Sequence, residues 1–131
     1  MGMRLGNGPS GLQLQESTGL AGFALINGTP TIISWSVPND GQMHRYEIFM
    51  IIKVASSETG GQVNLNFTAP DGTPQSIEAF AGGLPGPGIH FPVNSNGTGA
   101  VVVAPGTIVS ITEQTALTAG AAVLYAEIWG S

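Results

Sequence analysis

The chain has 131 residues, room for a single domain, and its Lys+Arg 3 against Asp+Glu 8 give a formal net charge of −5 at pH 7. Three basic residues are too few for the cationic patch that binds nucleic acid or an anionic membrane, so neither partner is expected. Charged residues make up 8% of the chain and hydrophobic residues 42%, which excludes a disordered polar chain. So few charges predict that a partner covers part of the surface.

The absence of cysteine excludes disulfides, thiolate metal sites and a cysteine nucleophile. Residues 1–8 lack the apolar segment of a signal peptide, and no apolar run reaches the ~18 residues that a membrane span needs. We therefore expect the chain to be made in a cytoplasm.

Residues 1–19 are rich in Gly, Ser, Asn and Gln and are predicted to form an extended N-terminal arm that precedes a domain spanning 20–131. Leu12 and Leu14 alternate with glutamines, a pattern that suits an added edge strand. The alternative is a loose terminus without a role, which is common in proteins.

From Leu20 onward, Gly, Pro and Asn-Gly turn signals recur at intervals of about 8–12 residues, a spacing typical of short antiparallel strands. The predicted strands are 20–26, 31–37, 43–55, 62–69, 74–81, 88–93, 99–104, 106–115 and 121–129. Eight or nine strands without a helix predict an all-β fold, an antiparallel jelly-roll sandwich that follows the extended N-terminal arm.

Two of these strands carry apolar side chains on both faces. In 43–54 the even positions are largely apolar, yet Phe49 and Ile51 occupy the middle of the opposite face. In 121–129 the even positions again suit a core, and the opposite stripe includes Val123, Tyr125 and Trp129. Such a second face predicts burial against another subunit. Coverage by the arm or by a loop of the same chain is the alternative.

No catalytic or metal-binding pattern is evident. His44 and His90 lack the spacing of metal ligands, and Asp40 and Asp71 precede glycines in turns, where an aspartate usually bonds its own backbone. The glycine-rich segment 82–88 is not followed by a helix that could hold a phosphate. The sequence therefore predicts a protein that is not an enzyme and that uses no cofactor and no metal.

Four segments, 31–41, 58–63, 67–73 and 116–130, resemble small jelly-roll virion proteins of tailed bacteriophages, which are similar to the trimeric heads of tumour necrosis factor and C1q. The resemblance covers about residues 20–130. It implies a homotrimeric structural protein on the virion surface that decorates the head by binding the major capsid protein. The short N-terminus favours a free-standing accessory protein over the end of a fibre.

In trimers of this kind the subunits pack around a threefold axis through an apolar face of one sheet. The matching residues here are Phe49, Ile51, Val123, Tyr125 and Trp129. The resemblance further implies that the arm around Leu5, Leu12 and Leu14 grips the capsid, where many weak contacts add up.

The alternative function is a tail or fibre head module that binds a receptor or carbohydrate. It would use Trp35, Tyr125 or Trp129 as a platform on which a sugar ring stacks. These aromatic residues lie in strand patterns and not in loops, which argues against that function.

Overall fold

The computed structural model of the chain describes residues 12–25, 30–54, 61–80, 88–90, 100–115 and 122–130. These residues form two antiparallel sheets and contain no helix, which confirms the all-β class. The strands are β1 (Gln13–Ser17), β2 (Phe23–Ala24), β3 (Thr31–Ser36), β4 (His44–Val54), β5 (Gln62–Thr68), β6 (Pro74–Glu78), β7 (Gly88–His90), β8 (Ala100–Val103), β9 (Ile108–Thr115) and β10 (Ala122–Gly130). Every strand range predicted above overlaps one of them.

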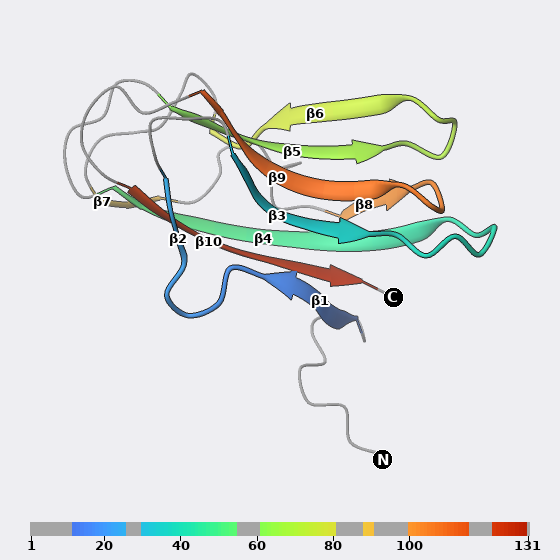
Figure 1. Cartoon of the computed structure of the whole chain (residues 1–131), viewed down its shortest axis with the longest axis horizontal. Coiled ribbons are helices and arrows are strands. Elements are labelled where there is room, and N and C mark those ends of the chain that lie inside the picture. Colours follow the sequence, from blue (N-terminus) through green and yellow to red (C-terminus); the bar gives the residue numbers. More distant parts are fainter. Residues whose placement is uncertain are drawn as a thin grey trace, which may run out of the picture.

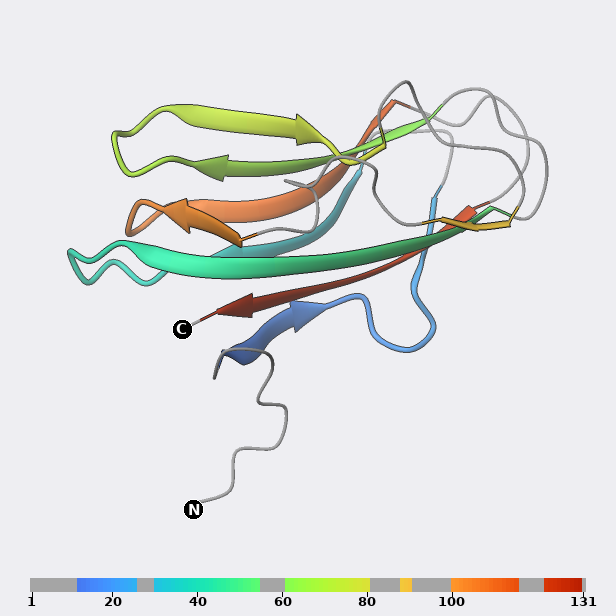
Figure 2. The same ribbon diagram turned by 180° about the vertical axis from the view of Figure 1, so that it is seen from behind.

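The two sheets form two layers (Figures 1 and 2). The six-stranded sheet has the order β1-β10-β4-β7, with β2 also pairing with β10 and β8 also pairing with β4. The four-stranded sheet has the order β3-β9-β5-β6. β4 and β10, the two strands with two apolar faces, are therefore neighbours in the middle of the larger sheet.

The core lies between the sheets and is built by alternation along each strand. Burial along β4 switches at every residue, with all the even positions from His44 to Val54 buried. β10 alternates in the same way, so that Leu124 and Ile128 are fully buried. Val63 and Leu65 of β5 meet them from the other layer. A period of two places these side chains on one face of each strand.

β1 occupies the second half of the expected arm. Its residues pair antiparallel with the end of β10, from Gln13 opposite Gly130 to Ser17 opposite Glu127, with a register shift between Leu14 and Glu16. The segment is extended, and it forms the edge of the six-stranded sheet of its own chain. A bulge at such a position disturbs the ladder and so discourages unwanted pairing at the edge.

At one end of the sandwich a tight turn carries the chain from β8 in one sheet to β9 in the other. The Gly106 backbone N–H donates to the Pro38 carbonyl at 3.2 Å, and the Val37 N–H donates to the Thr107 carbonyl at 2.8 Å. Gly106 has a φ of 72°, and a Cβ there would approach the Asn39 side chain. The turn and the loop that precedes β4 therefore hold each other in place.

Candidate functional site

The five residues predicted to form a subunit interface all lie on the outer face of the six-stranded sheet. In the register of β10 and β4, Tyr125 is opposite Ile51, Val123 is opposite Lys53 and Trp129 is opposite Glu47. Phe49 is opposite Glu127 on the same face. Opposed residues of an antiparallel pair point to the same side. The side chains thus form one continuous patch that points away from the core.

The patch extends onto the neighbouring strands. Leu14 of β1 is opposite Trp129, Val102 of β8 is opposite Arg45, and Ile89 of β7 is opposite Lys53. Their side chains are 41%, 44% and 60% exposed, and Phe49 is 36% exposed. We call this surface the apolar face: Leu14, Phe49, Ile51, Ile89, Val102, Val123, Tyr125 and Trp129.

A loop of the same chain covers part of the apolar face. Ser17 and Phe23 pair with β10 residues that have only two residues between them, whereas residues 18–22 lie between Ser17 and Phe23. Residues 18–22 therefore form a loop that leaves the plane of the sheet. A Cβ on Gly22 would come within 2.6 Å of the Val123 side chain and 2.8 Å of the Tyr125 ring. The loop therefore lies against Val123 and Tyr125. The alternative interpretation, coverage by a loop of the same chain, therefore holds for Val123 and Tyr125. Phe49 and its exposed neighbours remain accessible to solvent.

The loop and the sheet enclose a groove of about 950 Å³. Residues 17–20 line one side, and Phe49, Ile51, Tyr125 and Glu127 line the other. The lining is mainly aliphatic and aromatic, with one carboxylate at Glu127. A groove of this size accepts several apolar side chains of a partner.

Charged groups of both signs surround the apolar face. Arg45 and Lys53, two of the three basic residues of the chain, lie at the two ends of the outward-facing row of β4, with Glu47 and the apolar residues between them. The Trp129 indole N–H donates to Glu127 Oε1 at 3.1 Å. Glu47 Oε2 is buried without a hydrogen-bond partner. Within the part of the chain that the structure describes, no ion pair is formed by either Arg45 or Lys53.

The outer face of the four-stranded sheet is polar. Asn66 Nδ2 donates to Thr112 Oγ1 at 3.0 Å and lies 3.3 Å from Ser110 Oγ. The Ser76 hydroxyl donates to Asn66 Oδ1 at 2.7 Å, and Asn64 Nδ2 donates to Ser76 Oγ at 2.9 Å. These amides and hydroxyls bond one another across three strands, and Asn64 Oδ1 is the one atom of the group that is buried without a hydrogen-bond partner.

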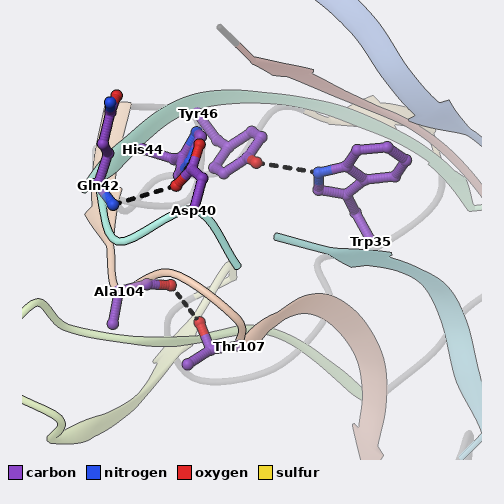
Figure 3. A network of polar contacts seen from close by, with 7 residues as sticks. All are labelled: Trp35, Asp40, Gln42, His44, Tyr46, Ala104 and Thr107. Atoms are coloured by element: carbon purple, nitrogen blue, oxygen red, sulfur yellow. Dashed lines mark hydrogen bonds and ion pairs between the residues drawn. The ribbon is translucent and has the colours of Figure 1, made fainter. Parts of the chain in front are cut away.

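A further polar cluster lies where β3 meets the start of β4 (Figure 3). His44 Nε2 lies 2.9 Å from Asp40 Oδ1, and the Gln42 backbone N–H donates to the same oxygen at 3.0 Å. The hydrogen bond with His44, followed by that with Gln42, holds the pKa of the Asp40 carboxyl below its ordinary value of 3.8. This arrangement closes the loop at Asp40.

Trp35 belongs to the same polar cluster. Its indole N–H donates to the Tyr46 hydroxyl at 3.0 Å, and the Tyr46 ring stacks on His44 with 6.3 Å between ring centroids (Figure 3). Burial raises the pKa of the Tyr46 phenol, and the hydrogen bond from Trp35 opposes that rise. Trp35 is half-buried against the core. Part of the indole surface is therefore covered by the core.

The residues expected in the capsid-gripping arm differ in their surroundings. Leu14 is 41% exposed on the apolar face, whereas Leu12 is 5% exposed. Leu5 lies outside the described residues, and so does most of the glycine-rich segment 82–88. The sequence analysis missed the groove, because its wall is a loop that only the pairing of β1 and β2 with β10 brings over the sheet.

Within the described ranges, no group of at least three His, Asp or Glu side chains is placed to hold a metal ion. The same ranges contain no helix of sufficient length and hydropathy to cross a membrane. Comparison of the chain with known protein families, with curated proteins and with solved structures found no match.

Proposed function

We propose that the chain is a structural protein that assembles through the apolar face, a homotrimeric decoration protein on the outer surface of a phage head. The observation that carries this proposal is the asymmetry of the two layers: one outer face is largely polar and internally hydrogen-bonded, and the other has apolar side chains on five strands, β1, β4, β7, β8 and β10. A contiguous exposed apolar surface bordered by charges is typical of a protein interface.

The proposed fold is a jelly roll, and the strand order supports it. β3 lies in the four-stranded sheet, β4 in the other, and β5 and β6 return to the first. β7 and β8 then pair with β4, β9 returns to pair with β3 and β5, and β10 ends between β1 and β4. Repeated crossing between two antiparallel sheets is how a jelly roll is wound.

The charge pattern supports assembly with copies of the same chain. The chain carries few charges, yet the apolar face is bordered by Arg45, Lys53, Glu47 and Glu127. Because this border contains both signs, it can pair with a rotated copy of itself. A closed ring of three copies would cover Phe49 and Ile51 in each subunit, and symmetric closure is usual for assemblies of identical chains.

The alternative, a tail or fibre head module that binds a receptor or carbohydrate, has less support. Trp35 is hydrogen-bonded to Tyr46, and Tyr125 lies under the loop at Gly22. Trp129 is the remaining candidate platform, half-buried beside Glu127. A glycan array tests this alternative, and binding that is lost in Trp129→Ala would favour it over the decoration role.

Binding to the capsid is proposed to involve the arm around Leu5, Leu12 and Leu14. Leu14→Glu is the informative variant, because Leu14 is exposed whereas Leu12 is buried. The test is sedimentation of the purified protein with phage heads that lack it, with a Ser34→Glu variant on the polar face as the control. Stoichiometric co-sedimentation of the wild-type protein and weaker binding of Leu14→Glu are expected. A protein that stays at the top of the gradient would contradict the decoration role.

A further inference from the structure

We infer that Leu20 of each subunit inserts into the groove on the apolar face of the next subunit, so that the loop formed by residues 18–22 locks the assembly. This inference rests on the proposed self-assembly and names the element that makes its specific contact. Its three supports are the exposure of Leu20, the shape and lining of the groove, and the charges around it.

Leu20 is completely exposed, with a relative accessibility of 101%. The loop that carries it is nevertheless well defined: the Gly22 N–H donates to the Gly19 carbonyl at 3.1 Å, and the Gly19 N–H donates to Ser17 Oγ at 3.2 Å. Gly19 and Gly22 have φ values of 79° and 72°, a region that suits glycine. A hydrogen-bonded turn therefore presents a leucine to solvent.

The loop is also fixed to the sheet on both sides. The Thr18 backbone N–H donates to the Ala126 carbonyl at 3.0 Å, and the Ala126 N–H donates to Thr18 Oγ1 at 3.1 Å. Gly22 sits directly on Val123 and Tyr125. The loop thus forms a rigid wall for the groove, and it holds Leu20 at the rim without filling the space between that wall and Phe49.

The occupant that fits is a second copy of this chain. Each subunit carries an exposed aliphatic side chain and, beside it, a mainly apolar groove of about 950 Å³ with room for that side chain. Contacts of this kind, in which one surface of each copy meets a different surface of the next, close into a ring when the rotation allows it. The trimer proposed above is such a ring.

Charge complementarity points to the same occupant. Glu127 is exposed and lines the groove. Arg45 and Lys53 are exposed on the same face. A neighbouring copy supplies an apolar side chain for the groove and a cation for the Glu127 carboxylate. A lipid tail or an unrelated apolar peptide supplies only the apolar group and no cation.

The absence of native cysteine allows a direct test by crosslinking. Leu20→Cys and Phe49→Cys are made in separate chains, because both positions line the same groove and a double variant could crosslink within one chain. The two proteins are mixed, allowed to exchange subunits and treated with a short bismaleimide. We expect a covalent heterodimer that neither variant forms alone under the same conditions.

The matched control is Ile108→Cys mixed with Phe49→Cys, because Ile108 is a comparably exposed aliphatic residue, 57% accessible, on the opposite outer face. This pair should give no crosslink. Suppose that the wild-type protein is a trimer, but the crosslink yield between Leu20→Cys and Phe49→Cys is no higher than in this control. That result would overturn the inference about Leu20 and leave the proposed assembly standing. A monomeric wild-type protein would instead overturn the assembly itself.

Leu20→Asp gives a second readout. The side chain is fully exposed, so the strand signal in far-ultraviolet circular dichroism should be unchanged, while association should weaken by at least about 30-fold, the effect of losing an interface hot spot. Association as tight as in the wild-type protein would contradict the role of Leu20.

Discussion

The two outer faces of the sandwich differ in how their side chains are satisfied. On the four-stranded sheet, Asn66 joins Ser110, Thr112 and Ser76 in a network of hydrogen bonds. On the six-stranded sheet, Phe49 remains open to solvent and Glu47 has an unpartnered oxygen. The polar face also has one unpartnered oxygen, Asn64 Oδ1, but its other amide and hydroxyl groups bond one another, whereas the opposite face exposes apolar side chains. The comparison teaches that two outer faces of one small sandwich can differ in chemistry while the core between them is continuous.

The largest effect is expected from a charge in the middle of the apolar face. Ile51→Glu places a carboxylate opposite Tyr125, where burial in an interface would leave it unpaired. Association should weaken by at least about 30-fold, while the monomer keeps its strands because Ile51 lies outside the core. Light scattering during size exclusion measures the mass.

Ser34→Glu is the control, because Ser34 is exposed on the polar face opposite Ser110. Its mass in solution should equal that of the wild-type protein. If Ser34→Glu dissociated the assembly and Ile51→Glu did not, the assignment of roles to the two faces would be reversed.

The next effect concerns the loop that covers Val123 and Tyr125. Gly22→Ala combines a φ of 72° with a Cβ that would approach Val123 Cγ1 to 2.6 Å. We expect the free energy of unfolding to fall by about 2–4 kcal/mol, from backbone strain and overpacking together. Chemical denaturation measures it.

Gly19→Ala separates the two causes. Gly19 has a φ of 79°, but a Cβ there would meet nothing within 4 Å. Only the backbone strain remains in this variant, so the free energy of unfolding should fall by about 1–2 kcal/mol. Equal losses in the two variants would mean that the loop does not lie against the sheet.

A smaller effect is expected on the polar face. Asn66→Ala removes hydrogen bonds to Thr112 and Ser76 at a half-buried position. The free energy of unfolding should fall by about 1–2 kcal/mol, the usual net value of one or two such bonds. The mass of the assembly should not change, and dissociation of the variant would show that this face also contributes to assembly.

The smallest effect concerns pH. Because its hydrogen bonds with His44 and Gln42 depress the pKa of Asp40 below 3.8 in the folded chain, the ionised carboxylate favours folding. This contribution is complete above that ordinary value and is lost as the pH falls through the lower folded pKa. Asp40→Asn should therefore lose less stability than the wild-type protein on acidification below pH 3.8, as measured by thermal unfolding against pH. Parallel profiles would contradict this role of the Asp40–His44 contact.

The sequence predicted the fold class because alternation in β4 and β10 is unambiguous: the even positions from His44 to Val54 and from Ala122 to Ile128 are buried. It also placed Phe49, Ile51 and Tyr125 on one surface, since the spacing within a strand determines its faces. That this surface binds other subunits stays a prediction.

The sequence did not predict the role of residues 13–22. Gln13–Ser17 is a polar stretch, and its pairing with β10 joins positions more than 100 residues apart, as between Gln13 and Gly130. The alternation of Leu12 and Leu14 with glutamines indicated an edge strand, but a local pattern contains no signal for the strand with which it pairs. The exposure of Leu20 follows from the loop that this pairing creates, so the groove could be recognised only in three dimensions.

The mass of the protein in solution tests the central claim most directly. Light scattering during size exclusion at micromolar concentration should give three times the chain mass of 13.3 kDa, because in the proposed trimer partner copies cover the apolar face. A single species of 13.3 kDa under the same conditions would contradict assembly through Phe49, Ile51 and their neighbours.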